Sequence, residues 1–274
     1  MMVQPSFSLI HLADLQCGFG ADDRALQKLR WLVPELEPDL VVLTGDVTRH
    51  CRTGEFAKVR QLVSELEEAA EVMAVPGDRD LQWWRRPYLP VGSAAKYERF
   101  QEFVRSEIAP TVDLPDAVVV GVTTAHGLAW GSLTAGGPLS TAGYLPRRET
   151  RRAKQVFSQA AETKARIVVM HHSPLSGANR LARVKSARKR LLDAGADIVL
   201  CGDGSDWAVE MIHGVTIVCG GSRGKPNGEA KSVGFHRMSV DHRSVNIELY
   251  RWSSERNQYY RSDLHAFARR RVVE

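Results

Sequence analysis

The chain has 274 residues, 43% of them hydrophobic and 25% charged, which is ordinary for a globular protein of one large domain or two small ones. No apolar run approaches the roughly 20 residues that a bilayer-spanning helix needs, and residues 1–10 lack the basic start and the cleavage site of a signal peptide. The four cysteines lie far apart without a C-x-x-C pair, which favours buried free thiols over zinc or disulfide sites. We therefore expect a cytoplasmic protein without a membrane partner.

The net charge of the chain is +5, and only nine of its 37 basic residues are lysine, so 28 are arginine. Arginine suits phosphate because its planar guanidinium donates two parallel hydrogen bonds. A GC-rich genome produces the same excess of arginine for no physical reason. The charge therefore permits a phosphate-bearing partner without establishing one.

Apolar strands alternate with amphipathic helices from residue 7 to about residue 200, which predicts an α/β fold. The predicted strands are 7–13, 39–45, 71–76, 117–124, 166–171 and 197–201. Most of them are continuous apolar runs, as expected for strands that are buried on both faces. The predicted helices have apolar residues at spacings of three and four, and they cover 23–33, 55–69, 94–108, 147–163 and 180–194.

After residue 205 the pattern changes to alternating apolar and polar residues between turns, which predicts antiparallel strands that close a second sheet. These strands are 215–219, 234–240, 244–250 and 257–261. We expect a single domain over residues 1–274, with residues 205–262 forming mainly the strands of the second sheet. The run Arg269-Arg270-Arg271 is expected to be a solvated end.

Five of the predicted strands end in a loop that carries an Asp or a His, in most cases beside a Gly. The loops contain Asp14-Leu15-Gln16, Gly45-Asp46, Gly77-Asp78-Arg79-Asp80, His171-His172-Ser173-Pro174 and Gly202-Asp203-Gly204-Ser205. A single Asp after a strand is commonly a helix cap or a turn residue. Several carboxylates that meet at the carboxyl edge of a sheet, however, repel one another unless a cation lies among them. A hard divalent metal ion is the simplest such cation.

The order of these motifs resembles that of the calcineurin-like metallophosphoesterases, particularly the bacterial branch that is similar to cyclic-nucleotide phosphodiesterases. The motifs of that family are D-x-H, G-D, G-N-H-D, H-H-x-P and G-H-x-H, and the similarity covers nearly the whole chain. The resemblance implies a four-layer α/β/β/α sandwich of two mixed sheets. It also implies two metal ions, commonly Mn or Fe, that are bridged by the aspartate of G-D, and a metal-bound hydroxide that attacks a phosphoester.

The resemblance assigns a ligand set to each metal, and both sets depart from the family pattern. The first set is Asp14, Gln16, Asp46 and Ser205, where the family has Asp, His, Asp and His. The second set is Asp46, Asp78, His171 and Asp203, where the family has Asp, Asn, His and His. Ser205 is a weak ligand because it is neutral and short, whereas the aspartates favour Mn or Mg over Fe or Zn. We expect one ion or none rather than two.

Arg79 occupies the position of the catalytic histidine of the family, and Asp80 occupies the position of the acidic residue that follows it. A guanidinium can hold a transferring phosphoryl group, but it cannot donate a proton at ordinary pH. Alternatively, Arg79 pairs with Asp46, Asp78 or Asp203 and neutralises a site that has lost its metal. We predict Arg79 and Asp80 as catalytic residues, with His172 and His50 as accessory candidates.

These departures leave more than one function open. The first interpretation is a divalent-metal-dependent phosphoesterase that acts on a phosphodiester or a phosphomonoester such as a nucleotide. The second is a catalytically inactive relative that serves as a binding or scaffolding subunit. The third, a nucleic-acid-processing or nucleic-acid-binding protein, is permitted by the basic charge but not favoured.

The predicted helix 180–194 contains a run of basic side chains, namely Arg180, Arg183, Lys185, Arg188, Lys189 and Arg190. They form either a solvated face or a patch that attracts phosphate. The sequence does not predict an oligomeric state.

Overall fold

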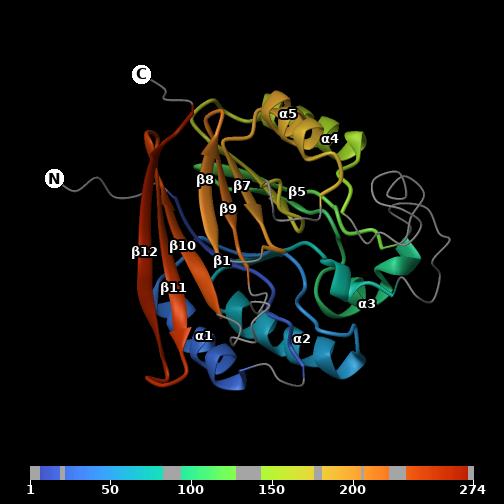
Figure 1. Ribbon diagram of the computed structural model, residues 1–274, viewed down its shortest axis with the longest axis vertical. Helices are drawn as coiled ribbons and strands as arrows, with labels where there is room; N and C mark the ends of the chain where they lie inside the picture. Colours follow the sequence, from blue (N-terminus) through green and yellow to red (C-terminus); the bar gives the residue numbers. More distant parts are fainter. Residues whose placement is uncertain are drawn as a thin grey trace.

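The computed structural model describes residues 7–18, 22–82, 94–127, 143–175, 181–204, 207–221 and 233–270. Within these ranges the strands form two mixed sheets of six (Figure 1). The first sheet contains β1 (Phe7–Leu12), β2 (Leu40–Leu43), β3 (Glu71–Ala74), β10 (Gly234–Val240), β11 (Ser244–Ser253) and β12 (Gln258–Ala268). The second contains β4 (Thr111–Asp113), β5 (Ala117–Gly121), β6 (Ala165–Met170), β7 (Ile198–Cys201), β8 (Ala208–Ile212) and β9 (Val215–Cys219).

The strand order is β12-β11-β10-β1-β2-β3 in the first sheet and β4-β5-β6-β7-β9-β8 in the second. Strands β1, β2 and β3 run parallel, and so do β5, β6, β7 and β9. The strands β10, β4 and β8 pair antiparallel with β1, β5 and β9. The carboxyl ends of the parallel strands therefore gather along one edge of each sheet.

Helices cover the outer faces of the two sheets (Figure 1). The first sheet packs on α1 (Asp23–Glu35), α2 (Thr53–Glu67) and the short α3 (Glu98–Phe103), through a core that includes Leu29, Phe56 and Phe100. The second packs on α4 (Arg147–Gln159) and α5 (Val184–Ala194), through a core that includes Phe157 and Leu191. Side chains of both sheets form a third core between them. The result is the expected four-layer α/β/β/α sandwich.

The C-terminal strands are distributed differently from the prediction that residues 205–262 mainly form the second sheet. Strands β8 and β9 extend the second sheet, whereas β10, β11 and β12 complete the first. In the register of β1 with β10, His11 lies opposite His236. The open edge of β1 is thus paired by a strand more than 200 residues away, and a local apolar pattern carries no information about such a pairing.

Several element boundaries also differ from the prediction. The predicted helix 94–108 consists of a 3-10 turn at Ala94–Lys96 followed by the six residues of α3. Beyond α3 the Arg105 guanidinium donates to the Val72 carbonyl at 2.7 and 2.9 Å, which holds the chain against β3 instead of continuing the helix. Strands β4 and β8 were not predicted, since β4 is only three residues long and β8 is partly exposed.

The solvated end predicted for Arg269-Arg270-Arg271 is confirmed for Arg270, which is exposed, but is wrong for Arg269, and Arg271 lies outside the described residues. Arg269 is only 6% exposed, and its guanidinium donates to the carbonyls of Thr163, Lys164 and Asp241. All four cysteines are buried and free, as predicted. Among the described residues, no helix combines the length and apolarity that crossing a lipid bilayer requires.

Candidate metal centre

Three of the predicted ligands directly follow strands and share an unusual backbone conformation. Asp14, Asp46 and Asp203 follow β1, β2 and β7, and they have φ values of 51°, 48° and 54°. A left-handed backbone is uncommon for residues other than glycine and is concentrated at functional sites, where the surrounding structure enforces it. Here it turns the chain abruptly at each strand end, so that the three aspartates lie along the same edge of the sandwich.

Glycines let the loops at this edge approach one another closely. A Cβ atom on Gly77 would lie 2.2 Å from the Asp46 backbone nitrogen and 2.9 Å from His171 Cε1. A Cβ on Gly45, which has φ +85°, would lie 2.5 Å from the Gly77 nitrogen. Because these neighbours are mostly backbone atoms, no side-chain rearrangement could make room for a larger residue. The G-D and G-D-R-D loops therefore stack backbone against backbone, with His171 against both.

His171 is fully buried, and its orientation is set by a single hydrogen bond. Its Nδ1 lies 2.8 Å from the Thr44 carbonyl oxygen, which can only accept, so Nδ1 carries the proton and donates it. The other ring nitrogen, Nε2, has no hydrogen-bond partner and lies 3.5 Å from Asp46 Oδ1. A histidine that is anchored through one nitrogen to a carbonyl and presents the other to carboxylates is arranged as a metal ligand.

Asp14, Asp46 and His171 are all buried, and each has a potential ligand atom within 4.8 Å of those of the other two. Burial, followed by the charge of Asp46, raises the pKa of Asp14 to about 7. Burial also raises the pKa of Asp46. Burial alone would lower the pKa of His171, but the carboxylates of Asp46, Asp203, Asp14 and Asp78 outweigh it and raise this pKa to about 10. The predicted ligands thus form one anionic cluster, which a divalent cation fits.

Arg79 contributes a positive charge to this cluster. Its backbone N–H donates to Asp46 Oδ1 at 2.8 Å, and its side-chain Nε lies 3.2 Å from Asp46 Oδ2. The Asp46 carboxylate is 6% exposed, whereas the Arg79 side chain is 43% exposed. The guanidinium therefore pairs with the predicted bridging ligand from the solvent side, one of the two roles that its sequence position suggested.

Asp80 does not have the environment of a catalytic residue. It is completely buried, and its carboxylate accepts hydrogen bonds from the backbone N–H groups of Gly77, Val47 and Thr48 and from the Thr48 hydroxyl, at 2.8–3.2 Å. These bonds tie the G-D loop to the G-D-R-D loop. Burial, followed by the charge of Asp46, raises its pKa to about 6. Asp80 therefore positions the two loops, and the catalytic role expected for it stays a prediction.

His172 holds Asp78 in place through a chain of hydrogen bonds. The Thr124 hydroxyl accepts from the His172 backbone N–H at 3.1 Å and lies 3.0 Å from Nδ1, to which it donates its own proton. Nε2 of His172 then carries the ring proton and donates it to Asp78 Oδ2 at 3.1 Å. Although Asp78, His171 and His172 lie close enough to share an ion, this arrangement makes His172 a donor to Asp78.

The remaining predicted residues lie around the cluster or outside the described ranges. The Gln16 backbone N–H donates to the Asp46 carbonyl at 2.9 Å, so Gln16 lies beside the G-D loop. The exposed ring of His50 lies 3.2 Å (Nδ1) from the buried Glu55 Oε1. Ser205 lies outside the described residues. The structure thus brings together Asp14, Asp46, Asp78, His171 and Asp203, with Arg79 at their border.

Thr44 and His11 have roles that sequence reasoning missed. Beneath the carbonyl that anchors His171, the Thr44 hydroxyl lies 2.9 Å from His11 Nε2. His11 in turn stacks on His236, with Nδ1 atoms 3.3 Å apart. Burial lowers the pKa of His11 to about 3, so this stack is neutral. In the sequence, the only indication of this buried polar network is His11 itself, a histidine within the apolar run 7–13.

Comparison with solved structures shows the fold. The chain matches GAP50 of Plasmodium, described as the anchor in the inner membrane complex, with 13% identity and a TM-score of 0.63 over 98% of this chain and 90% of that one. Purple acid phosphatase PPD1 from yellow lupin matches with 13% identity and a TM-score of 0.64, over 97% of this chain and 54% of the enzyme. Vacuolar Protein Sorting 29 from Cryptosporidium parvum matches with 13% identity and a TM-score of 0.52, over 97% and 100% of the two chains.

No curated protein matches the sequence. The family model of the calcineurin-like phosphoesterases, in contrast, matches residues 7–203, which span β1 to the loop after β7 and include every described residue of the candidate centre. That match covers more than half of the chain. The protein therefore belongs to the calcineurin-like phosphoesterase family.

Proposed function

We propose that the chain binds one divalent metal ion, Mn or Mg, and hydrolyses a phosphoester at the edge where Asp14, Asp46, His171 and Asp203 meet. The observation that carries this proposal is the buried Nε2 atom of His171, which has no hydrogen-bond partner and faces the Asp46 carboxylate. His171 and the aspartates would hold the ion. Carboxylate oxygens dominate this ligand set, which suits a hard ion better than Fe or Zn.

A divalent ion at this place would stabilise the charge of phosphoryl oxygens and make a water molecule a better nucleophile. The residues of the chain supply the rest. Thr44 holds Nδ1 of His171 as a donor, so that Nε2 is the nitrogen that would bind the ion after releasing its proton. Asp80 fixes the two loops that carry Asp46 and Arg79, and His172 fixes Asp78.

Arg79 would serve as the phosphate-binding group of this reaction. Its guanidinium is partly exposed at the border of the cluster, so a phosphoryl group that arrives from solvent meets it before it meets the aspartates. Arginine suits this role because its fork donates two hydrogen bonds to phosphate oxygens. It does not replace the proton donor that the histidine of the family supplies, so we expect slow turnover with leaving groups that need protonation.

A second candidate function rests on the same ion pair. Because Arg79 occupies both oxygens of Asp46, the cluster has an internal cation, and the protein would then be a binding or scaffolding subunit without activity. Phosphoester substrates, nucleotides among them, belong only to the first candidate.

Metal titration followed by an activity assay separates the two candidates. After treatment with a chelator, the melting temperature is measured with millimolar Mn, Mg, Fe or Zn, and hydrolysis is measured with bis(p-nitrophenyl) phosphate and p-nitrophenyl phosphate. Metal binding raises the melting temperature by mass action. Asp46→Ala should abolish both the rise in melting temperature and the turnover. The matched control for loss of a carboxylate is Asp39→Ala, because Asp39 lies at the opposite, amino end of β2.

Each result assigns the protein to one candidate. A rise with turnover supports the phosphoesterase, and a rise without turnover supports a metal-binding subunit that does not hydrolyse these substrates. An unchanged melting temperature with all four metals contradicts the metal centre and leaves Arg79 as the cation of the cluster.

A further inference from the structure

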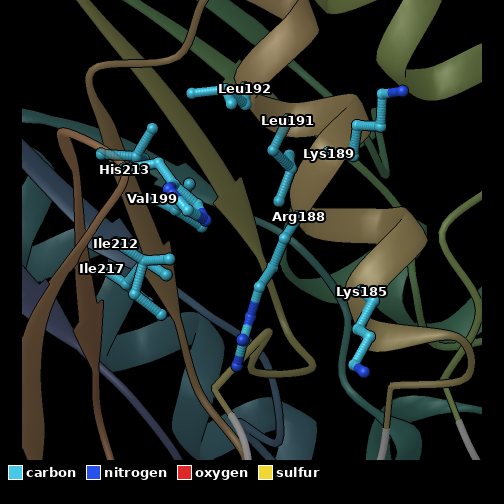
Figure 2. A pocket seen from close by; sticks show the side chains of 10 residues that line it. Lys185, Arg188, Lys189, Leu191, Leu192, Val199, Ile212, His213 and Ile217 are labelled. Atoms are coloured by element: carbon cyan, nitrogen blue, oxygen red, sulfur yellow. The ribbon is translucent and has the colours of Figure 1, made fainter.

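A cavity of about 530 Å³ lies on the outer face of the second sheet, between α5 and the hairpin of β8 and β9. We call it the α5 trough. Its aliphatic lining consists of Leu191, Leu192, Val199, Ile212, Val215 and Ile217. Its basic lining consists of Lys185, Arg188, Lys189 and His213. Figure 2 shows the two walls, with Arg188 extending from α5 into the space beside the strands, while the ammonium groups of Lys185 and Lys189 lie at the outer rim of the helix, away from Ile212 and Ile217.

The trough arises because the helices do not cover the whole sheet. A helix with its side chains is about 10 Å wide and strands are about 4.8 Å apart, so one helix covers about two strands. In the described part of the chain, the outer face of this six-stranded sheet carries α4 and α5, which bury β9 but leave the edge strand β8 partly exposed beside the helix. Val199 and Ile217, which are almost fully buried, form the floor beside this uncovered edge.

The charges on α5 are opposite to those that would stabilise the helix. A helix N-terminus favours acidic side chains, but the first turn of α5 contains none, and Lys185, Arg188 and Lys189 lie in its N-terminal half. Lys185 and Lys189 are exposed, and neither forms an ion pair with any acidic side chain that the structure describes. Helix stability therefore does not account for these cations, and together with the helix N-terminus they make one wall of the trough positive.

We propose that the α5 trough binds a free aliphatic carboxylate, with its chain on the floor of Leu, Val and Ile side chains and its head against the cations of α5. The cavity volume lies within the range of small-molecule sites, and an apolar floor with few charged groups at its border is typical of them. An aliphatic ligand is favoured over a nucleotide because the lining contains no Phe, Tyr or Trp side chain to stack on a base. This site is separate from the metal centre and does not depend on the proposed phosphoesterase activity.

Isothermal titration calorimetry with monomeric decanoate tests the site, with decanol as the neutral counterpart of the same chain length. The variant Lys185→Glu with Lys189→Glu should weaken decanoate binding at least tenfold, because it reverses the charge of the wall. The matched control is Arg151→Glu with Lys154→Glu, which makes the same change of charge at exposed positions of α4 and should leave binding unchanged. Ile212→Asp, which places a carboxylate in the half-buried wall, should also abolish binding.

Five results would overturn the proposal, four of them measured with decanoate or decanol. These are no heat of binding with the unmodified protein, equal affinity for decanol and decanoate, an equal loss in the α4 control, and loss of binding in Asp46→Ala, which would place the ligand in the metal centre. Binding to phosphatidylglycerol vesicles without binding to free decanoate would also overturn it, in favour of a membrane surface.

Discussion

Arg79 contacts both carboxylate oxygens of Asp46, through its backbone N–H to Oδ1 at 2.8 Å and through its side-chain Nε to Oδ2 at 3.2 Å. The guanidinium lies at Oδ2, whereas Nε2 of His171 lies 3.5 Å from Oδ1. A metal ion at the candidate centre and the guanidinium would therefore compete for the charge of one carboxylate. Since the backbone contact does not depend on the side chain, substitution of Arg79 tests the competition without displacing the loop.

Arg79→Ala should lower the stability of the metal-free protein by about 1 kcal/mol, the upper range for partly exposed ion pairs. The same substitution should strengthen Mn binding about fivefold, because a competing interaction of that size is removed. Chemical denaturation and calorimetric titration measure the two effects. Arg30→Ala, which removes a partly buried ion pair with Glu65 far from the centre, is the control and should leave Mn affinity unchanged. Weaker Mn binding in Arg79→Ala would show that Arg79 supports the metal instead of competing with it.

Metal affinity should increase with pH. In the metal-free protein, the pKa of Asp14 is raised to about 7 and that of His171 to about 10, so both groups release a proton when an ion binds. Between pH 7.5 and 8.5 only His171 still holds its proton, which predicts about a tenfold gain in affinity for one pH unit. Calorimetry of Mg binding in buffers of different ionisation enthalpy counts the protons released. An affinity that does not change over this range would refute the raised pKa of His171.

The stability of the metal-free protein should change with pH in the opposite direction. The raised pKa values of Asp14 and Asp80 destabilise the folded state as pH rises from about 4 to about 7. The raised pKa of His171 contributes stability that is complete below about 6.5 and is lost as pH rises towards 10. The lowered pKa values of the buried His11, His126 and His236 act in the opposite sense, but only below about pH 6.5. Denaturation in the presence of a chelator should therefore show a more stable protein at pH 7.5 than at pH 9, and saturating Mg should reduce the difference. Higher metal-free stability at pH 9 would contradict the raised pKa of His171.

Asp80→Asn should destabilise the protein by about 1–3 kcal/mol. The Asp80 carboxylate now accepts from three backbone N–H groups, and in the amide one of its two oxygens becomes an NH2 group, which cannot accept. Since these donors belong to the loops that hold Asp46, the variant should also weaken Mn binding. Denaturation and metal titration measure the two effects. Normal stability combined with lost turnover would restore the catalytic role that the sequence suggested for Asp80.

Thr124→Val should remove the hydrogen-bond partner of His172 Nδ1, while Asp78 keeps the ring proton on Nε2. The hydroxyl is the partner of both the backbone N–H and Nδ1 of His172, so its loss leaves two buried polar groups unsatisfied, at a cost of about 1–3 kcal/mol. Nitrogen chemical shifts of the imidazole report the tautomer directly. The neighbouring Thr123→Val, whose hydroxyl bonds only to the Ile108 carbonyl among described groups, is the control and should leave those shifts unchanged. An unchanged Nδ1 shift in Thr124→Val would show that the hydroxyl does not hydrogen-bond to the ring.

The sequence was sufficient to predict the four-layer fold and most of the cluster. Asp14, Asp46 and Asp203 each follow a short apolar run, and parallel strands bring such positions to one edge regardless of the details of packing. The partners of His172 were not predictable, because Thr124 lies 48 residues away and meets it only through the pairing of β5 with β6. For the same reason a local pattern could not assign 215–219 and 234–240 to different sheets, since apolar strands look alike wherever they pair.

The position of β1 between β2 and β10 has a consequence for how the protein is made. The family match ends at residue 203, yet the strand that leads into Asp14 has hydrogen-bonded neighbours on both sides only when β10, residues 234–240, is in place. A chain that has been synthesised only as far as Asp203, the last described aspartate of the candidate centre, therefore still exposes β1 as an edge strand. The strand that leads into the candidate metal centre therefore gains both of its neighbours only after β10, a segment without any predicted ligand, has been synthesised.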